Sequence, residues 1–173
     1  ESGAVPRLRP GSLVIACATV APDFAVRLGQ RLAASQLLLL DAPVSGAAAK
    51  AATGEMTMMT SGPAEAYDKA EPILAAMAAR IYRLGDSHGI GSKVKIINQL
   101  LAGVHIAAAA EAMALGLREG VAADALYDVI THSAGNSWMF ENRVPHILSG
   151  DYTPLSAVDI FVKDLGLVLD TAR

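Results

Sequence analysis

Short apolar runs alternate with helix-period stripes along the first half of the chain. Four runs have the length of a buried strand and end near turn residues: 13–17, 37–40, 56–60 and 81–84. Between the runs, apolar residues recur every three or four positions, as in the stripe of Phe24, Leu28 and Leu32 behind Pro22. Because strands and helices alternate, we predict an α/β sheet layered with helices.

The segment between the second and third runs has no clear periodicity. It begins at Asp41-Ala42-Pro43, passes through the small residues of 44–47 and reaches Thr53-Gly54. Since glycine and proline commonly mark turns, we predict a loop here, at the carboxyl end of a strand. The strand at 56–60 follows, and Ser61-Gly62-Pro63 then predicts the start of a helix.

From Gly89 onward the pattern is helical, and no convincing strand follows. The longest helical pattern in the chain predicts a helix of about 28 residues, or about 42 Å, that ends at Gly120. Shorter helical patterns come after it: 123–132, 136–148 and 155 to the end. We therefore place a domain boundary between Leu84 and Gly91, with residues 1–88 in an α/β domain and residues 89–173 in an all-α domain.

The α/β domain is incomplete for a doubly wound sheet. It offers only about four strands, and no Gly-x-Gly-x-x-Gly follows an early strand, although that motif marks dinucleotide binding. We therefore expect the back half of a Rossmann-type nucleotide-binding domain, with the front half missing, joined to the helical domain.

Composition and charge narrow the possible partners. The net charge is −3 without a basic stripe, so no nucleic-acid partner is expected. The single cysteine, Cys17, permits no internal disulfide and suits a reducing, cytoplasmic location. Residues 1–10 lack the pattern of a signal peptide. The histidines are scattered without acidic partners at ligand spacing, so no metal site is expected.

The apolar stretch 94–117 is long enough to cross a membrane. The polar residues inside it include Asn98, Gln99, His105 and Glu111. Because unpaired polar groups are costly in hydrocarbon, we predict no membrane partner and interpret the stretch as a buried helix of a soluble protein. One short chain offers few partners for a helix that is apolar nearly all round, so we also predict a homo-oligomer, a dimer or a tetramer.

A set of polar residues on this helix is a candidate for chemistry. Lys95, Asn98 and Gln99 have the spacing i, i+3 and i+4, which places them on one helix face. Gly89 and Gly91 allow a tight turn whose backbone N–H groups are open to an incoming ligand. The alternative is a solvent-facing polar stripe on an amphipathic helix, and this stretch alone does not decide between them.

Three further stretches combine with this helix. The small residues of 44–47 follow a strand, where exposed backbone N–H groups can hold a carboxylate. Lys163-Asp164 places a cation and an anion on a late helix, and Asn136-Ser137-Trp138 forms a polar and aromatic turn. Each stretch alone also has an ordinary interpretation: a loop, a surface ion pair and a helix cap.

Together and in this order, the stretches resemble the β-hydroxyacid dehydrogenase family, which includes 3-hydroxyisobutyrate dehydrogenase. The resemblance extends from about Gly11 to the end of the chain. It rests on Asp-Ala-Pro-Val-Ser-Gly at 41–46, Gly-x-Gly-x-x-x-Lys-x-x-Asn at 89–98 and Lys-Asp-Leu at 163–165. Within the family the chain is most similar to the L-threonate dehydrogenase branch, through segments 18–22, 136–142 and 150–165.

The resemblance implies a fold and an activity. The fold is the C-terminal part of a Rossmann-type domain followed by an all-α domain similar to the C-terminal domain of 6-phosphogluconate dehydrogenase. The activity is hydride transfer between a small hydroxyacid, L-threonate-like or a related 3-hydroxyacid, and NAD or NADP. Two alternatives stay open: a tartronate semialdehyde or glyoxylate reductase, and a non-catalytic dehydrogenase-like assembly module. Without the Gly-rich turn, the chain by itself is expected to bind NAD weakly and to be inactive.

The resemblance also implies roles for single residues. Lys95 matches the catalytic lysine, the general acid/base at the substrate oxygen. The substrate-binding positions are Ser45, Gly46, Ala47, Asn98, Gln99 and Asp164, and the cofactor-binding positions are Thr19 and Lys163. Two positions depart from the family pattern. Ala47 replaces a second glycine and makes the loop less permissive, and Gln99 replaces an asparagine and changes the depth or shape of the pocket.

Overall fold

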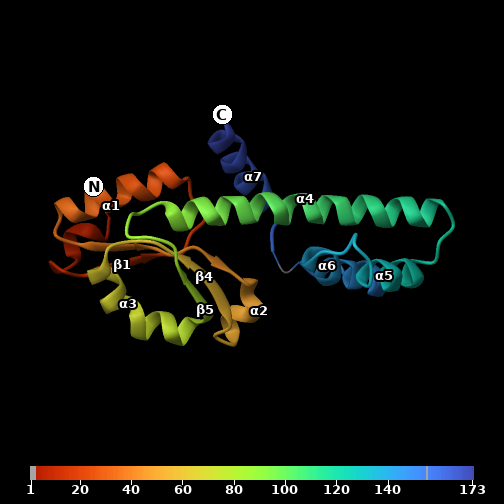
Figure 1. Cartoon of the computed structure of the whole chain (residues 1–173), viewed down its shortest axis with the longest axis horizontal. Coiled ribbons are helices and arrows are strands. Elements are labelled where there is room, and N and C mark those ends of the chain that lie inside the picture. Colours follow the sequence, from red (N-terminus) through yellow and green to blue (C-terminus); the bar gives the residue numbers. More distant parts are fainter. Residues whose placement is uncertain (1–2, 155) are drawn as a thin grey trace. The chain divides into compact units, whose positions relative to one another are not determined.

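The computed structural model describes residues 3–154 and 156–173, which fall into two compact units (Figure 1). Unit 1 lies within Glu1–Ile97 and Gly166–Arg173, and unit 2 lies within Asn98–Leu165. The predicted start of the last helix at Leu155 lies outside the described residues.

Unit 1 is built from alternating strands and helices. In chain order these are the 3-10 helix η1 (Val5–Arg7), β1 (Leu13–Ala16), α1 (Pro22–Ala34), β2 (Leu38–Asp41), β3 (Val44–Ser45), α2 (Ala47–Ala52), β4 (Met56–Thr60), α3 (Ala64–Met77) and β5 (Ala78–Arg83). The predicted α/β fold is confirmed, with a strand at each predicted run and the helices after Pro22 and Pro63 in place. The last strand begins at Ala78 rather than Ile81, because α3 passes into it without a turn.

The loop predicted after Asp41 is wrong in part, because it contains β3 and α2. The two residues of β3 pair antiparallel with β4, Val44 opposite Met58 and Ser45 opposite Thr57. The six residues of α2 read Ala-Ala-Ala-Lys-Ala-Ala, and alanine has the highest helix propensity. Elements this short show no periodic stripe in the sequence, so the hydrophobic pattern could not reveal them.

The strands form two small sheets that meet at the end of β2. One sheet is the parallel pair β1–β2, and the other has the order β3–β4–β5, with β4 and β5 parallel. Asp41 and Ser61 exchange backbone hydrogen bonds of 3.0 and 2.8 Å, which link the end of β2 to the residue after β4. Because β1 and β2 are parallel, their carboxyl ends lie at one edge, where open α/β sheets bind ligands.

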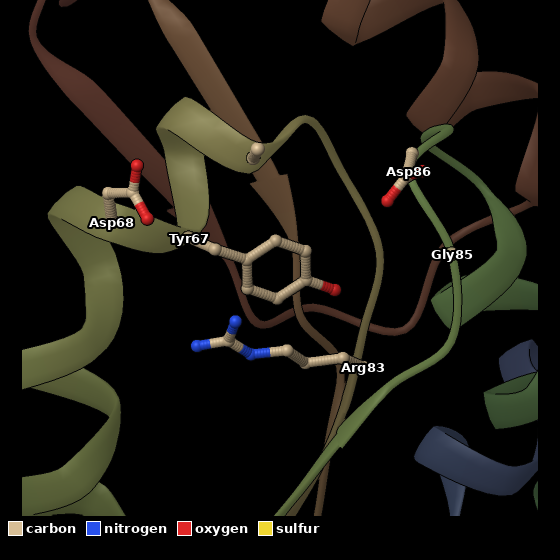
Figure 2. Close-up of a pocket in the computed structure, with 6 residues that line it drawn as sticks. Tyr67, Asp68, Arg83, Gly85 and Asp86 are labelled. Atoms are coloured by element: carbon tan, nitrogen blue, oxygen red, sulfur yellow. The ribbon is translucent and has the colours of Figure 1, made fainter.

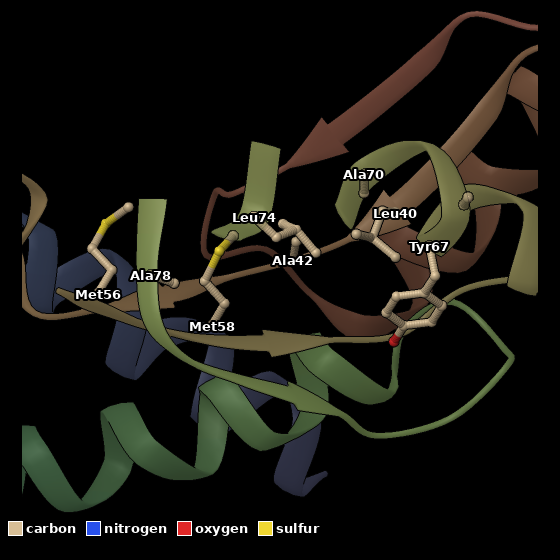
Figure 3. Close-up of a cluster of buried hydrophobic side chains, with 9 residues drawn as sticks. Leu40, Ala42, Met56, Met58, Tyr67, Ala70, Leu74 and Ala78 are labelled. Atoms are coloured by element: carbon tan, nitrogen blue, oxygen red, sulfur yellow. The ribbon is translucent and has the colours of Figure 1, made fainter. Parts of the chain in front are cut away.

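Strand β2 has a separate apolar cluster on each face. Leu40 belongs to a cluster formed with β4 and α3 (Figure 3): Leu40, Ala42, Met56, Met58, Ala66, Tyr67, Ala70, Leu74 and Ala78. Leu39 instead packs with Leu37 and with Leu32 of α1. Since successive strand residues point to opposite faces, α3 and α1 cover opposite faces of the sheet (Figure 1).

Helix α4 (Ile90–Arg118) has the predicted extent but is not a buried helix. It contains 29 residues, and in its most apolar stretch only 17% of the residues are buried. The exposed apolar side chains include Ile97, Leu100, Leu101, Val104, Leu115 and Leu117. The prediction of a buried helix is therefore wrong for the single chain. A helix of about 43 Å exceeds the diameter of a small domain, so a chain of this size cannot surround it.

Unit 2 is helical, as predicted for the second half of the chain. It contains most of α4 together with α5 (Ala123–Thr131), α6 (Trp138–Ser149) and the start of α7 (Asp159–Ala172). Met113 of α4 packs with Phe140 and Val144 of α6. The Tyr127 ring of α5 stacks on Phe140 with centroids 5.9 Å apart. These contacts between apolar faces form the core of unit 2.

Candidate active site

The predicted site residues are divided between the two units. Unit 1 contains five of them: Thr19, Ser45, Gly46, Ala47 and Lys95. Unit 2 contains the other four: Asn98, Gln99, Lys163 and Asp164. Hydrogen bonds and an ion pair connect the unit 2 residues into one group. The unit 1 residues lie on three separate segments of the chain.

The polar face of α4 is buried rather than solvated. Lys95 is 7% exposed and Gln99 is 8% exposed, and Asn98 is half-buried. Apolar Ile97 and Leu101 are instead 60% and 53% exposed. The solvent-facing alternative is therefore wrong, because Lys95 and Gln99 are shielded from solvent while neighbouring apolar side chains are exposed. Lysine is seldom buried without a pairing or a function, so Lys95 is the first candidate for chemistry in unit 1.

A buried carboxylate from the end of β2 holds the first turn of α4. The Asp41 side chain is 1% exposed. Its Oδ2 accepts hydrogen bonds from the N–H groups of Gly89 and Ser92, both at 3.0 Å, and its Oδ1 accepts one from Ser92 Oγ at 2.7 Å. Ser61 Oγ donates to Asp41 Oδ2 at 3.2 Å and accepts from the Gly91 N–H at 2.9 Å. The prediction that these N–H groups are open to a ligand is therefore wrong, since the protein itself satisfies them.

Sequence reasoning missed Asp41, Ser61 and Ser92 as site residues. The first N–H groups of a helix lack intrahelical partners and carry the positive end of the helix dipole, so a carboxylate stabilises them. Such a cap normally comes from the residue just before the helix. Here the carboxylate of Asp41 is 51 positions from Ser92 in the sequence, and only the folded chain brings them together.

Gly89 and Gly91 allow the start of α4 to lie close to the sheet. Gly89 has φ = +94°, a conformation that L side chains rarely adopt. A Cβ atom at Gly91 would lie 2.3 Å from the carbonyl oxygen of Met59 in β4. The backbone of α4 therefore contacts the backbone of the sheet directly. Lys95 follows one helical turn after Ser92, so its position is set by this contact.

The predicted carboxylate loop has an unusual backbone. Ser45 ends β3, Gly46 has φ = +135° and Ala47 has φ = +55° at the start of α2. A left-handed φ at Ala47 fits a position where a glycine is usual in the family that the sequence resembles. The chain therefore turns sharply through Gly46 and Ala47, with an alanine in a conformation that costs about 1–2 kcal/mol.

Ala47→Gly is expected to stabilise the protein by about 1 kcal/mol. Glycine removes the strain of the left-handed φ, although its greater freedom in the unfolded chain cancels part of the gain. Denaturant unfolding of the two proteins measures the difference. Ala49→Gly, an exposed position in the same short helix, is the matched control and should destabilise by about 0.5–1 kcal/mol. A destabilised Ala47→Gly protein would contradict the strained backbone.

Thr19 lies at the carboxyl edge of the parallel pair of strands. It follows β1 closely and is half-buried, at an edge typical of ligand sites in open α/β sheets. Cys17 lies nearby and is also half-buried, and burial raises the pKa of its thiol. Since the thiolate is the reactive form, Cys17 is a poor nucleophile, and Thr19 is the better candidate for ligand contact at this edge.

In unit 2, a buried pair joins α4 to α7. Gln99 Nε2 donates to Asp164 Oδ2 at 2.6 Å, and Gln99 Oε1 accepts from Asn98 Nδ2 at 3.1 Å. Asp164 is 1% exposed, and its Oδ1 lies 2.8 Å from Lys163 Nζ. The Lys163 side chain is 54% exposed, and the buried carboxylate of its neighbour Asp164 anchors its ammonium.

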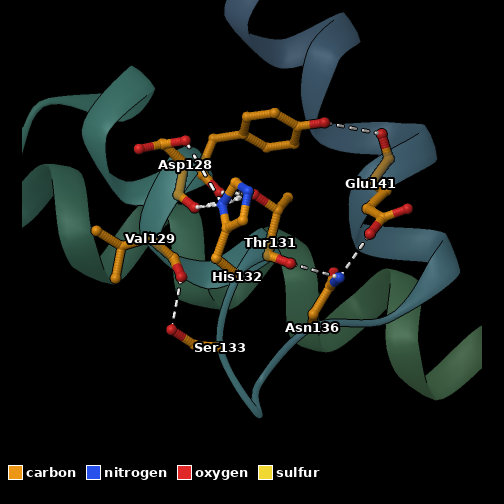
Figure 4. A network of polar contacts seen from close by, with 8 residues as sticks. Asp128, Val129, Thr131, His132, Ser133, Asn136 and Glu141 are labelled. Carbon is orange, nitrogen blue, oxygen red and sulfur yellow. Dashed lines mark hydrogen bonds and ion pairs between the residues drawn. The ribbon is translucent and has the colours of Figure 1, made fainter.

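The turn at 136–138 is a helix cap, the ordinary interpretation of this stretch. Ser137 Oγ accepts from the N–H of Phe140 at 3.0 Å and so caps α6. Asn136 Nδ2 donates to the Thr131 carbonyl oxygen at 3.0 Å and to Glu141 Oε1 at 2.6 Å, contacts that connect the end of α5 to the first turn of α6 (Figure 4). The polar side chains of this turn therefore stabilise the α5–α6 connection.

A pocket of about 200 Å³ in unit 1 is separate from the predicted residues. It is lined by Ala64, Tyr67, Asp68, Arg83, Gly85 and Asp86 (Figure 2). Arg83 lies over the Tyr67 ring, 4.7 Å from its centroid, and 3.8 Å from Glu71, so its charge already has partners. Among the described residues, no cluster of three or more metal-ligating side chains is found. The buried face of α4 remains the stronger candidate.

Two family profiles match the chain. The profile described as the NAD-binding domain of 6-phosphogluconate dehydrogenase matches residues 1–85. The profile described as the NAD-binding domain of NADP-dependent 3-hydroxyisobutyrate dehydrogenase matches residues 89–173. Nearly the whole chain is therefore covered by two adjacent dehydrogenase domains.

Full-length relatives agree with the profiles. An L-threonate dehydrogenase from Cupriavidus necator is 80% identical over 99% of this chain, which spans 58% of that protein. A crystal structure of 3-hydroxyisobutyrate dehydrogenase from Salmonella typhimurium is 59% identical, with a TM-score of 0.93 over 98% of this chain and 60% of that one. The structure of Psf3 with NADP+ and 2-OPP is 28% identical, with a TM-score of 0.91 over 97% of this chain and 59% of that one. The chain thus spans about three fifths of the length of these relatives.

Proposed function

Because the chain belongs to the 3-hydroxyisobutyrate dehydrogenase family, in its L-threonate dehydrogenase branch, we propose that the protein is an NAD(P)-dependent hydroxyacid dehydrogenase. The observation that carries the proposal is the burial of Lys95 on a helix whose first turn is bonded to the carboxyl edge of the sheet. This is the edge where α/β sheets bind ligands, and a buried lysine there suits acid/base catalysis.

In the proposed reaction, Lys95 accepts or donates the proton at the substrate oxygen. Oxidation of a secondary alcohol removes a hydride from carbon and a proton from oxygen, so the neutral amine of Lys95 accepts that proton. In the reverse direction the ammonium returns it to the carbonyl oxygen. Burial keeps bulk water from competing for this transfer. The bound cofactor supplies the chemistry that the chain lacks, namely a nicotinamide ring that accepts or gives the hydride.

We assign the substrate carboxylate to the loop of Ser45, Gly46 and Ala47. The loop turns sharply, with positive φ at Gly46 and Ala47, and successive backbone N–H groups in such a turn can bind an anion. The same loop follows β2, whose carboxyl end holds the first turn of α4. Asn98 and Gln99 provide amide groups next to Lys95 on the helix, and we assign these to the substrate as well.

The donor groups present also suit the nicotinamide end of a dinucleotide. Thr19 offers a hydroxyl at the carboxyl edge of the parallel strands, and Lys163 offers an ammonium on a half-exposed side chain that buried Asp164 anchors. The first turn of α4 is not available for the pyrophosphate, because Asp41 and Ser61 already accept its N–H groups. We therefore assign Thr19 and Lys163 to the cofactor, NAD or NADP.

The proposed substrate is L-threonate or a similar polyhydroxy acid. Asn98 and Gln99 are hydrogen-bonding groups on a buried helix face, and a site built to pair with hydroxyl groups rejects analogues that lack them. A protein of the relatives' full length that contains this chain, called the full-length form below, provides the test. Its kcat/KM for L-threonate should exceed that for 3-hydroxyisobutyrate by about 10²-fold or more.

Steady-state rates with each acid and with either cofactor measure this preference. An equal or reversed ratio would place the protein with the general 3-hydroxyacid enzymes. Preferential reduction of tartronate semialdehyde or glyoxylate would favour the reductase alternative instead. If neither acid nor semialdehyde turns over while the protein remains folded, the function is that of a non-catalytic assembly module.

We further propose that the exposed apolar face of α4 is covered by a second copy of the chain in a dimer or tetramer. The side chains of Leu100, Leu101 and Val104 are 41%, 53% and 52% exposed on consecutive turns, and contiguous apolar patches mark interaction surfaces. Light scattering at micromolar concentration should give a multiple of the chain mass. Leu101→Glu should shift it toward the monomer, whereas Lys93→Glu on the same helix should not. A monomeric unsubstituted protein would contradict the proposal.

We also propose a reducing, cytoplasmic location without nucleic-acid or membrane partners. With a net charge of −3, the protein does not have the excess of basic residues that nucleic acids and anionic lipids attract. Its single cysteine cannot form an intramolecular disulfide.

A further inference from the structure

We propose that Asp41, together with Ser61 and Ser92, positions Lys95 for catalysis. The inference rests on the proposed function, since it concerns how efficiently Lys95 transfers the proton. The three side chains are nearly inaccessible, with exposed fractions of 1%, 0% and 1%. None of them is a substrate or cofactor residue in the proposed assignment. They act through the helix that carries Lys95.

The cluster connects three segments through one carboxylate. Asp41 closes β2, Ser61 follows β4, and Ser92 lies in the first turn of α4. Asp41 accepts four hydrogen bonds: one from the N–H of Gly89 just before the helix, one from the N–H of Ser92 in its first turn and one from each serine hydroxyl. Ser61 adds a further bond by accepting from the Gly91 N–H at 2.9 Å. Both strand ends are therefore bonded to the same helical turn.

The negative charge of Asp41 matters as much as its shape. The four donors to its carboxylate are neutral N–H and O–H groups, so the charge is stabilised by these dipoles and by the positive end of α4. An asparagine has nearly the same size but only one acceptor oxygen. Its NH2 group would face N–H and O–H donors, which leaves buried donors unpaired. The first turn of α4 must then move to regain partners.

If the first turn of α4 moves, Lys95 is displaced with it. Ser92 and Lys95 are three residues apart, so they lie on the same side of the helix about 4.5 Å apart along its axis. The hydrogen-bonded backbone between them transmits a displacement almost unchanged. A misplacement of about 1 Å can cost about 10²-fold in rate when a proton must pass between aligned atoms. The cluster is therefore expected to affect turnover more than substrate binding.

The experiment compares Asp41→Asn with a matched control in the full-length form. Asp41→Asn should lower kcat by about 10-fold or more while KM for the hydroxyacid changes by less than about 3-fold. The control is Thr60→Val, which removes an equally buried hydroxyl whose hydrogen bonds go to Tyr67 Oη and the Tyr82 carbonyl oxygen. It should lower the melting temperature and leave kcat near that of the unsubstituted protein. A comparable loss of kcat in Thr60→Val would show that the Asp41 effect is general destabilisation.

A second variant covers the case in which Asp41→Asn does not fold. Ser92→Ala keeps the carboxylate and removes only the 2.7 Å hydrogen bond to Asp41 Oδ1. It should lower kcat by about 3- to 10-fold with KM nearly unchanged, because one of four bonds to the carboxylate is lost. Full activity of a folded Ser92→Ala protein would overturn the inference.

A double substitution separates this inference from the proposed function. If Asp41 acts through Lys95, then Asp41→Asn should reduce the residual rate of a Lys95→Ala protein by less than about 2-fold, because the effects of coupled residues are not additive. If Asp41→Asn lowers the rate by the same factor in the unsubstituted protein and in the Lys95→Ala protein, the positioning role is overturned while the proposed function stands. If Lys95→Ala itself retains full activity, the proposed function fails. Amide hydrogen exchange at Gly91 and Ser92 would then still report whether Asp41 holds the turn.

Discussion

Lys95→Ala in the full-length form is expected to lower kcat/KM for hydroxyacid oxidation by about 10²–10⁴-fold with the fold intact. The substitution removes the group that accepts the hydroxyl proton, and no other lysine lies on the buried face of α4 next to Asn98 and Gln99 in the described residues. Alanine is a strong helix former, so α4 should persist. Absorbance of the reduced cofactor measures the rate, and thermal unfolding checks the fold.

Two further substitutions sharpen this test. Lys93→Ala is the matched control, because Lys93 lies on the same helix but is exposed, and its removal should leave kcat/KM nearly unchanged. Lys95→Arg keeps a positive charge but cannot release its proton near neutral pH, so it should be almost as inactive as Lys95→Ala. Normal turnover by a well-folded Lys95→Ala protein would remove Lys95 from the mechanism. Normal turnover by Lys95→Arg would limit its role to charge.

Gly91→Ala is expected to destabilise the protein by at least about 3 kcal/mol. Its Cβ would lie 2.3 Å from the Met59 carbonyl oxygen and 3.1 Å from the Asp41 carbonyl oxygen. Both are backbone atoms of the sheet and cannot rotate away as a side chain can. The first turn of α4 must therefore lift from the sheet, which also breaks its bonds to Asp41 and Ser61. Denaturant unfolding of the purified variant measures the loss.

The matched control for Gly91→Ala is Gly166→Ala. Gly166 also lies inside a helix, α7, but no atom comes within 4 Å of a Cβ built there. Alanine at this position should stabilise the protein by about 0.5–1 kcal/mol through helix propensity alone. Equal stability of the Gly91→Ala and unsubstituted proteins would mean that the close backbone contact at the start of α4 does not exist.

Local patterns in the sequence predicted the elements that are long enough to show a period. The helix after Pro22 and the helix after Gly89 were predicted because each contains at least three turns of apolar residues or a helix-start signal. Helix α2 and strand β3 were missed because six residues and two residues display no period. The formation of β3 depends on its antiparallel pairing with β4, which no local signal announces.

The residues of the candidate site also differ in whether a local sequence pattern can reveal them. The sequence makes Lys95 a candidate because its spacing to Asn98 and Gln99 is local to one helix and because the flanking glycines match a known family pattern. From the sequence, Asp41 is only part of a loop motif. Its contact with Ser92 joins residues 51 positions apart, and its role as the cap of α4 follows from that contact alone.

The sequence by itself determined the α/β and helical halves, the long helix and the identity of its polar face, because these follow from the periodicity of neighbouring residues. The tertiary structure decided which surfaces are buried. It showed that the N–H groups at the start of α4 are bonded to Asp41 and Ser61, that Lys95 and Gln99 are shielded, and that the apolar side of α4 is exposed. Burial and hydrogen bonding between distant segments depend on how strands and helices are brought together, and a linear pattern does not contain that arrangement.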